Sequence, residues 1–192
     1  SLSEYSIPVV AGGVFCTYAP DKVAECQDID FIIRGEGEAP LKDLCLALAH
    51  DRSYKDIANL CYREGDSLVK NDMRPAMDLN EVPFADYSVF TNNDKQTLYR
   101  PMNGKIYKTI ALETQRGCPF KCSFCNSASH NPLYREETGS TFFRKKEMPR
   151  FAEELEHMVS TVKPELVFFL SDVFLLMTDR EFDEFYEIYS SY

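Results

Sequence analysis

The chain has 192 residues, and its 44% hydrophobic and 13% aromatic content provides enough apolar material for one or two folded domains. A formal net charge of −10 argues against general binding to a phosphate backbone, which needs clustered lysine and arginine, so nucleic acid is not expected as a partner. No apolar run reaches the roughly 18 residues of a membrane span, and no secretory signal is recognisable, so we expect a cytoplasmic location.

The first 70 residues alternate between strand and helix signals, as in an open α/β sheet. Apolar residues 7–11 and 30–34 predict two buried strands, and glycines follow both of them. A short helix is expected after Pro20, and a longer helix after the second strand is expected to bury one face. That face consists of Leu41, Leu44, Cys45 and Leu48, with Pro40 in the first turn. Residues 59–70 predict a hairpin that turns at Glu64-Gly65-Asp66.

Residues 71–106 contain prolines and lack sustained periodicity, so we interpret them as a linker. Beyond them, residues 107–115 and 166–170 predict two strands, the second of them buried, with a long loop and an amphipathic helix in between. That helix has Pro149 near its start and buries Phe151, Leu155, Met158, Val159 and Val162. Thr178 and Glu181 predict a capping box for a last helix. Its buried face holds Phe182, Phe185, Tyr186 and Tyr189.

Three of the seven cysteines lie within eight residues, in the pattern Cys118-x3-Cys122-x2-Cys125. Three thiolates at this spacing can reach one metal centre without closing a long loop, and iron–sulfur clusters are held by thiolates. A [4Fe–4S] cluster with three protein ligands leaves one iron open, which S-adenosylmethionine (SAM) can chelate through its amino and carboxylate groups. The remaining cysteines are expected to be small buried hydrophobic residues, namely Cys16, Cys26, Cys45 and Cys61.

Three other interpretations of the triplet stay open. His130 follows Cys125 by five residues and could complete a zinc site with three cysteines and one histidine. Cys61 could be brought in from afar as the fourth thiolate of an electron-transfer cluster. The thiols could also be unrelated free cysteines.

The segment 113–125, with the sequence ETQRGCPFKCSFC, closely resembles the signature of the radical SAM superfamily. The resemblance implies an enzyme that binds a [4Fe–4S] cluster at Cys118, Cys122 and Cys125, binds SAM and generates a 5′-deoxyadenosyl radical. It also places the cysteine loop at the C-terminal end of the first strand of a (β/α) barrel, where such barrels keep their active sites.

The same resemblance implies contacts around the cysteines. Phe124 would lie near the adenine of SAM, Arg116 and Gly117 would shape the loop, and Asp172 would accept hydrogen bonds from SAM or its ribose. Charge adds a separate hint, because residues 113–150 carry seven basic against four acidic side chains. The basic candidates for contact with the SAM carboxylate or an anionic substrate are Arg144 and Lys145.

The N-terminal part resembles the cobalamin-binding class of radical SAM proteins, in the segments VVAGGVFCTYAPDKV, DIDFIIRGEGEAPLKDL and LCYREGDSLVKN. In that class a Rossmann-like cobalamin domain precedes the barrel. The resemblance implies that the glycine-rich strand ends approach the nucleotide tail of the corrin and the domain junction. These residues are Gly12, Gly13, Gly35, Glu36 and Gly37.

We therefore predict an α/β fold with three parts: a partial Rossmann-like unit of the cobalamin-binding type (1–70), a linker (71–106) and the first βα units of a radical SAM barrel (107–192). Expected cofactors are a [4Fe–4S] cluster and SAM, with cobalamin as a candidate third. The expected reaction is cobalamin-linked methyl transfer, cyclisation or rearrangement of a small-molecule substrate, with flavodoxin or ferredoxin as the electron donor. A cobalamin-independent, RNA-modifying methylthiotransferase and a non-catalytic zinc or electron-transfer module are the alternatives. The chain resembles an interior fragment, so we expect no turnover by it alone.

Overall fold

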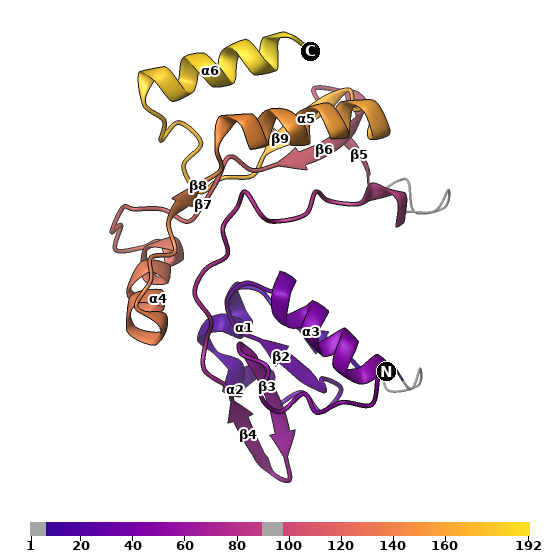
Figure 1. The fold of residues 1–192 in the computed structure, drawn as a ribbon, viewed down its shortest axis with the longest axis vertical. Coiled ribbons are helices and arrows are strands. Elements are labelled where there is room, and N and C mark those ends of the chain that lie inside the picture. Colours follow the sequence, from indigo (N-terminus) through magenta and orange to yellow (C-terminus); the bar gives the residue numbers. More distant parts are fainter. Residues whose placement is uncertain (1–6, 90–97) are drawn as a thin grey trace. The chain divides into compact units, whose positions relative to one another are not determined.

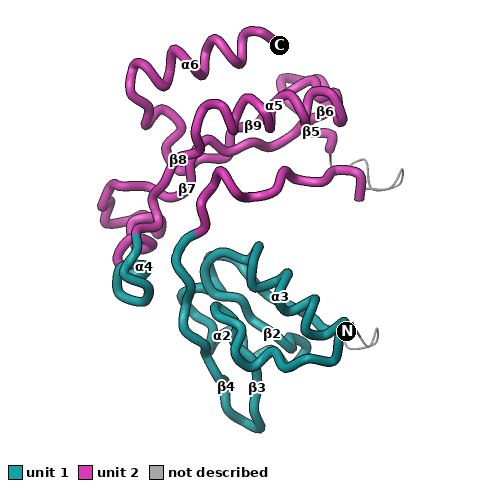
Figure 2. Tube along the Cα trace, in the orientation of Figure 1, with its two compact units in different colours: residues 1–76, 133–140 teal, residues 77–132, 141–192 magenta. Residues whose placement is uncertain are grey.

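The computed structural model describes residues 7–89 and 98–192. The chain divides into two compact units, which are coloured separately in Figure 2. Unit 1 comprises Ser1–Ala76 together with Leu133–Ser140, and unit 2 comprises Met77–Pro132 together with Thr141–Tyr192. The chain therefore returns to unit 1 after the cysteine loop and only then completes unit 2.

Unit 1 is built on a four-stranded sheet with the order β1-β2-β3-β4 (Figure 1). Its strands are β1 (Val10–Ala11), β2 (Phe31–Ile33), β3 (Leu60–Glu64) and β4 (Ser67–Lys70). β1 and β2 are parallel, with Val10 opposite Phe31, and the other two pairs are antiparallel. The predicted hairpin is confirmed, because Glu64 pairs with Ser67 and Gly65 turns the chain at a φ of 61°.

Both faces of the central strand β2 are buried, as expected when helices cover both sides of a sheet. The helices of this unit's first segment are α1 (Val14–Tyr18), α2 (Pro20–Val23) and α3 (Glu38–Ala49). Ile32 points to the cluster that α1 and α2 supply, which contains Cys16, Val23, Ala24 and Cys61. Phe31 and Ile33 point to the opposite cluster, which contains Leu44 of α3, Leu60 and Tyr62.

The buried face of α3 differs from the predicted one at three of its four positions. Leu44 is buried as expected, but the other three predicted positions are exposed: Leu41, Cys45 and Leu48. The buried positions are Pro40, Leu44 and Ala47, which form a stripe at i, i+4 and i+7. Because a proline and an alanine stand in that stripe, the more hydrophobic leucines beside it gave the wrong face.

The cysteines outside the triplet do not all share one environment. Cys16 and Cys61 are buried, as predicted for small hydrophobic residues. Cys26 and Cys45 are exposed, and the prediction is wrong for them. Cys26 lies beyond the end of α2, and Cys45 lies outside the buried stripe of α3, so neither faces a core.

Unit 2 contains a three-stranded sheet with the order β5-β6-β9. Its strands are β5 (Tyr99–Met102), β6 (Lys105–Leu112) and β9 (Leu166–Phe169). β6 and β9 are parallel, with Thr109 opposite Leu166, and helix α5 (Met148–Val162) lies between them in the chain. This is the strand–helix–strand order that the sequence predicts for the start of a (β/α) barrel.

A second hairpin joins β5 and β6, and the sequence-based interpretation misses it. Asn103 and Gly104 form its two-residue turn, with φ values of 50° and 76°. Asn-Gly is the strongest short hairpin signal, but it lies within the segment interpreted as a linker. The described part of residues 71–106 also holds the short 3-10 helix η2 (Tyr87–Val89), so much of this segment is structured. The predicted domain limits stay a prediction.

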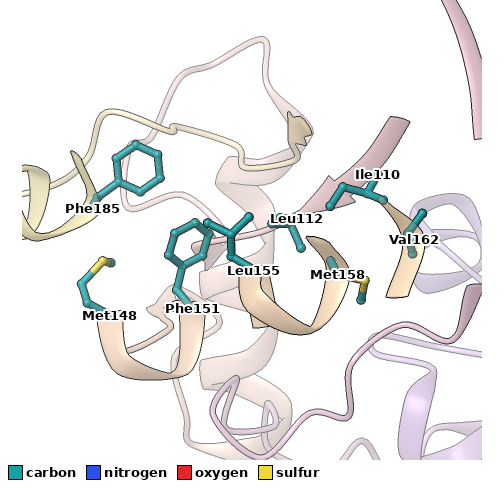
Figure 3. Close-up of a cluster of buried hydrophobic side chains, with 8 residues drawn as sticks. All are labelled: Ile110, Leu112, Met148, Phe151, Leu155, Met158, Val162 and Phe185. Atoms are coloured by element: carbon teal, nitrogen blue, oxygen red, sulfur yellow. The ribbon is translucent and has the colours of Figure 1, made fainter. Parts of the chain in front are cut away.

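The core of unit 2 forms where α5 packs on β6, and it confirms the predicted face of that helix (Figure 3). The buried side chains of α5 are Met148, Phe151, Leu155, Met158 and Val162, and Val159 packs against them. In Figure 3 they face Ile110 and Leu112 of β6 and Phe185 of helix α6 (Asp179–Ser190). Aliphatic and aromatic side chains of α5 and α6 therefore pack on one face of β6.

The last strand and helix are less buried than predicted. Residues of β9 are half-buried, and Leu170 just beyond it is 61% exposed, because β9 is the outer strand of the described sheet. The capping box of α6 is confirmed, since Thr178 and Glu181 exchange side-chain and backbone hydrogen bonds. Only Phe185 of the predicted α6 face is buried; the exposed ones are Phe182, Tyr186 and Tyr189.

The connection between the strands contains four short elements. They are β7 (Gln115–Arg116), η4 (Asn126–Ser129), α4 (His130–Thr138) and β8 (Arg144–Lys145). β7 and β8 pair antiparallel, so they form a two-stranded base for the loop that carries the cysteines. Across the described ranges, no helix combines the length and the apolar character that crossing a membrane requires.

Candidate functional site

The three clustered cysteines lie in the loop that follows β7. All three are free thiols; Cys118 is buried, and Cys122 and Cys125 are exposed. A local turn links the last two, because the amide of Cys125 donates a hydrogen bond of 3.2 Å to the carbonyl of Cys122. Within the described residues, no three His, Cys, Asp or Glu side chains already converge as a metal site. The ligand set Cys118, Cys122 and Cys125 therefore stays a prediction. All three thiols are free and can serve as metal ligands.

Cys61 does not suit the role of a fourth thiolate. Its side chain is fully buried in the core of unit 1. Burial there raises the pKa of its thiol to about 11, which disfavours the deprotonated form that binds metal. His130, the candidate fourth ligand of a zinc site, stacks its ring on Phe142, with centroids 4.7 Å apart and 23° between the planes. This contact gives His130 a packing role at the end of the loop.

Gly117 sets the start of the loop, as the sequence predicts. It has a φ of 85°, which strongly favours glycine. A Cβ at this position would stand 2.8 Å from Cδ1 of Phe142 and 3.1 Å from Cα of Phe143. The backbone before Cys118 is thus in close contact with the segment that leads into β8.

The C-terminal ends of β6 and β9 border an open pocket of about 350 Å³. Its lining includes Glu113, Arg116, Leu170, Ser171 and Asp172. The guanidinium of Arg116 is 2.5 Å from a carboxylate oxygen of Glu113, so these two charges neutralise each other and Asp172 adds a further carboxylate to the lining. Phe169 and Leu170 form the apolar part of this lining.

Asp172 is brought to the cysteine loop. The hydroxyl of Ser127 donates a hydrogen bond of 2.6 Å to Oδ1 of Asp172. Beside it, the hydroxyls of Thr114 and Ser171 are 3.4 Å apart and join the ends of β6 and β9. Phe124, by contrast, is 92% exposed, so its ring is open to a ligand.

The two basic candidates, Arg144 and Lys145, are held by contacts within the chain. Nε of Arg144 donates to the carbonyl of Met77, and Nη1 donates to the carbonyl of Phe142, both at 2.6 Å. Nζ of Lys145 contacts both carboxylate oxygens of Glu181, at 2.8 and 3.0 Å. Their cationic groups therefore brace β8 and the start of α6, and their contact with a ligand stays a prediction.

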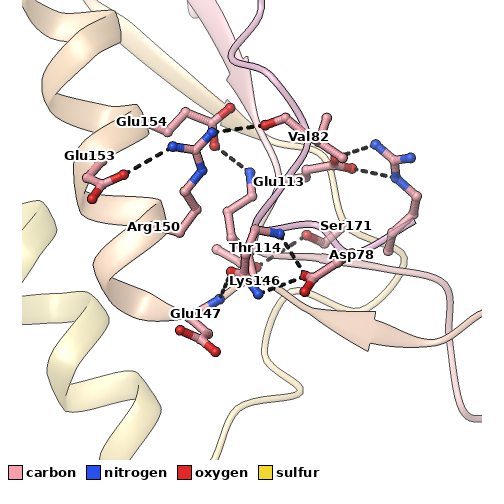
Figure 4. A network of polar contacts seen from close by, with 12 residues as sticks. Asp78, Val82, Glu113, Thr114, Lys146, Glu147, Arg150, Glu153, Glu154 and Ser171 are labelled. Atoms are coloured by element: carbon pink, nitrogen blue, oxygen red, sulfur yellow. Dashed lines mark hydrogen bonds and ion pairs between the residues drawn. The ribbon is translucent and has the colours of Figure 1, made fainter. Parts of the chain in front are cut away.

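A polar network ties β8 to α5 beneath the strand ends (Figure 4). The amide of Lys146 donates to the carbonyl of Thr114 at 2.8 Å, and its ammonium pairs with Glu154. Both charged side chains are almost completely buried. Arg150 adds a hydrogen bond of 3.0 Å to the carbonyl of Val82, as Figure 4 shows. The network fixes the chain that enters and leaves the loop region.

In unit 1, the two glycine-rich strand ends lie side by side because β1 and β2 pair in parallel, and Thr17 links them. The hydroxyl of Thr17 donates to the carbonyl of Gly13 and accepts from the amide of Gly35, both at 2.9 Å. Gly13 has a φ of 95° and Gly35 a φ of 72°. A Cβ at Gly12, Gly13 or Gly37 would meet no atom of the chain within 4 Å, so the backbone there is open to close approach by a ligand.

Gly35 and Glu36 are instead covered by the chain itself. The hydroxyl of Tyr134, from the α4 segment of unit 1, accepts a hydrogen bond of 3.2 Å from the amide of Glu36. A Cβ at Gly35 would stand 2.5 Å from that hydroxyl. Arg34 reinforces the contact through an ion pair of 2.5 Å with Glu137. Neither Thr17 nor Tyr134 carries a signal in the sequence, because no spacing rule connects residues so far apart in the chain.

The curated proteins that resemble this chain in sequence carry the names of enzymes. No family model matches it. An uncharacterised methyltransferase of Pyrococcus horikoshii is 30% identical over 177 residues, which is 91% of this chain and 35% of that protein. The anaerobic magnesium-protoporphyrin IX monomethyl ester cyclase of Cereibacter sphaeroides is 28% identical over 155 residues, which is 79% of this chain and 23% of that protein. The chain thus spans about a third or less of the length of these relatives.

Two solved structures share its fold. The radical SAM methyltransferase TsrM of Kitasatospora setae, with tryptophan and a SAM analogue bound, has a TM-score of 0.62 at 17% identity, over 96% of this chain and 33% of that one. The cobalamin-dependent SAM radical enzyme OxsB, with aqua-cobalamin and SAM bound, has a TM-score of 0.61 at 18% identity, over 93% of this chain and 23% of that one. The likeness confirms the predicted α/β fold class, a partial Rossmann-like unit followed by the first βα units of a barrel.

Proposed function

We propose, because this chain is a relative of the cobalamin-binding radical SAM proteins, that Cys118, Cys122 and Cys125 hold a [4Fe–4S] cluster whose open iron binds SAM. The observation that carries the proposal is the position of the three free thiols. They lie in the loop beyond the end of β6, and Asp172, beyond the end of parallel β9, is hydrogen-bonded to that loop. The C-terminal ends of parallel strands are where (β/α) barrels keep their active sites.

The donors fit such a cluster. Soft thiolates favour iron–sulfur clusters, and the exposed side chains of Cys122 and Cys125 can be reached by incoming iron and sulfide. The buried thiol of Cys61 is a poor fourth ligand, which supports an iron left open for SAM. A bound and reduced cluster would supply one electron for the cleavage of SAM into methionine and a 5′-deoxyadenosyl radical.

The chain's own residues orient SAM in this proposal. The carboxylate of Asp172 accepts hydrogen bonds from the polar groups or ribose of SAM, beside the pocket at the ends of β6 and β9. The exposed ring of Phe124 offers a stacking surface for adenine. Arg144 and Lys145 serve this site by holding β8 in place, which is the role that their hydrogen bonds support.

For cobalamin, the open backbone at Gly12, Gly13 and Gly37 offers the approach that a nucleotide tail needs. Gly35 contributes by its link to the other strand end through Thr17, and the amide of Glu36 bonds to Tyr134, so neither offers open backbone. The whole protein acts, in this proposal, as an enzyme on a small-molecule substrate and takes electrons one at a time from a flavodoxin or ferredoxin. Methyl transfer comes first among its reactions, because both the Pyrococcus horikoshii relative and TsrM are named methyltransferases; cyclisation and rearrangement follow.

Anaerobic reconstitution with iron and sulfide tests the cluster. The reduced protein is expected to give a [4Fe–4S]+ electron paramagnetic resonance signal that changes when SAM is added. Cys122→Ser should abolish the signal, because it removes one of three ligands. Cys26→Ser is the matched control, since it removes another exposed thiol outside the triplet and should leave the signal unchanged.

Two results would contradict the proposal. An iron-free protein that retains stoichiometric zinc would make the loop structural. Equal loss of signal in Cys26→Ser and Cys122→Ser would show that the triplet is not the ligand set.

A further inference from the structure

Asn131, the second residue of α4, connects the two sides of the cysteine loop. Its Nδ2 donates a hydrogen bond of 2.9 Å to the carbonyl of Cys118. Its Oδ1 accepts from the amides of Phe142 and Phe143, at 3.0 and 2.9 Å, and from the hydroxyl of Thr141 at 2.9 Å. One amide side chain therefore satisfies backbone groups on both flanks of the loop.

These contacts make Cys118 the anchored member of the triplet. It is buried, whereas Cys122 and Cys125 are exposed. The hydrogen bond described above for these two cysteines joins them to each other in a local turn. The backbone at Gly117, just before Cys118, lies close to Phe142. The ring of His130 stacks on the ring of Phe142. Asn131 thus bonds directly to the backbone of Cys118, beside the packing of Gly117 and His130 on Phe142.

We propose that Asn131 is a positioning residue for the cluster, a role that rests on the proposed function. It holds the backbone of Cys118 against residues 141–143, so that the first thiolate is in place before the other two close around the metal. Such outer partners of metal ligands typically change metal affinity by roughly 10- to 100-fold when they are removed. The role needs no charge. It needs an amide side chain, because Nδ2 must donate a hydrogen bond while Oδ1 accepts others.

Asn131→Asp isolates the donor half of this arrangement. The carboxylate can still accept from the amides of Phe142 and Phe143, but it cannot donate to the carbonyl of Cys118 and repels it. Asn126→Asp is the matched control. It introduces the same charge in the same loop at an exposed residue.

The measurement is the loss of iron from the reconstituted full chain under a chelator, together with the electron paramagnetic resonance signal of the remaining cluster. Asn131→Asp is expected to lose iron at least about tenfold faster than the wild type and to show an altered signal. Asn126→Asp should match the wild type. Equal rates in all three proteins, or the same acceleration in both variants, would overturn the positioning role while leaving the cluster itself established. A wild type that takes up no iron would overturn the proposed function and this inference together.

Hydrogen exchange of the iron-free protein distinguishes positioning from a general fold defect. In Asn131→Asp, the amides of β6 should keep their wild-type protection, because the core beneath them is unchanged. Loss of protection throughout β6 in this variant would show that Asn131 supports the fold as a whole, which would overturn its specific role at Cys118.

Discussion

The fit of Tyr134 against the end of β2 leads to a sharp prediction for Gly35→Ala. Gly35 has a φ of 72°, and a Cβ would stand 2.5 Å from the hydroxyl of Tyr134 and 3.0 Å from Cε of Met73. The left-handed backbone alone costs an alanine about 1–2 kcal/mol, and overpacking adds about 1–3 kcal/mol. We therefore expect the free energy of unfolding of unit 1 to fall by about 2–5 kcal/mol.

Gly139→Ala is the control for the backbone contribution. Gly139 lies in the same unit with a φ of 71°, but a Cβ there would meet no atom within 4 Å. Its loss should stay at about 1–2 kcal/mol, so the difference between the two variants measures the steric contact. Urea titration followed by hydrogen exchange of the β2 amides provides the measurement, because β2 is the buried strand of this unit.

A double variant tests the cause. Tyr134→Phe alone removes the acceptor of the Glu36 amide and should cost about 1 kcal/mol. Combined with Gly35→Ala it also removes the atom closest to the new methyl group, so the two losses should be less than additive. Strict additivity, or equal losses in Gly35→Ala and Gly139→Ala, would refute the packing of α4 on this strand end.

Two further predictions concern ion pairs of unit 2. Lys146→Met leaves the buried carboxylate of Glu154 without its cation and should lower the free energy of unfolding by about 3–5 kcal/mol. In urea titrations, the double variant Lys146→Met/Glu154→Leu should regain most of this stability. A double variant as unstable as the single one would contradict this reasoning. The ammonium of Lys145 and the backbone amide of Thr178 lower the pKa of Glu181 below its ordinary 4.5. The ionised carboxylate therefore stabilises the folded state above pH 4.5, and this stabilisation is lost as the pH falls through the lowered pKa of the folded state. Glu181→Gln should therefore weaken the acid-side decline of the melting temperature below about pH 4.5, and an unchanged decline would contradict the assignment.

The elements that could be predicted are those with a strong local pattern. β2 is a run of bulky apolar residues buried on both faces, and α5 repeats its apolar residues at helical spacing, so both were clear in the sequence. The face of α3 was wrong because Pro40 and Ala47, which are weak hydrophobic signals, hold the core positions. The Asn103-Gly104 hairpin carried a clear signal, which the surrounding prolines obscured.

The candidate site divides in the same way. The cysteine triplet is local in sequence and needs no tertiary information to be found. The contacts that organise its surroundings are distant: Ser127 and Asp172 are 45 residues apart, and Tyr134 and Glu36 are 98 apart. A single serine, tyrosine or asparagine has no periodic pattern, so its partner becomes visible only in the folded chain.

The return of residues 133–140 to unit 1 has a consequence for biosynthesis. Domains generally fold as units while the chain emerges from the ribosome, starting with the N-terminal one. Here the segment up to Ala76 cannot cover the end of β2 until Ser140 has been made, because Tyr134 and Glu137 supply that cover. By then the cysteines have already been translated. The nascent chain therefore exposes the uncovered end of β2 and three free thiols at the same time, a window in which chaperones would meet both.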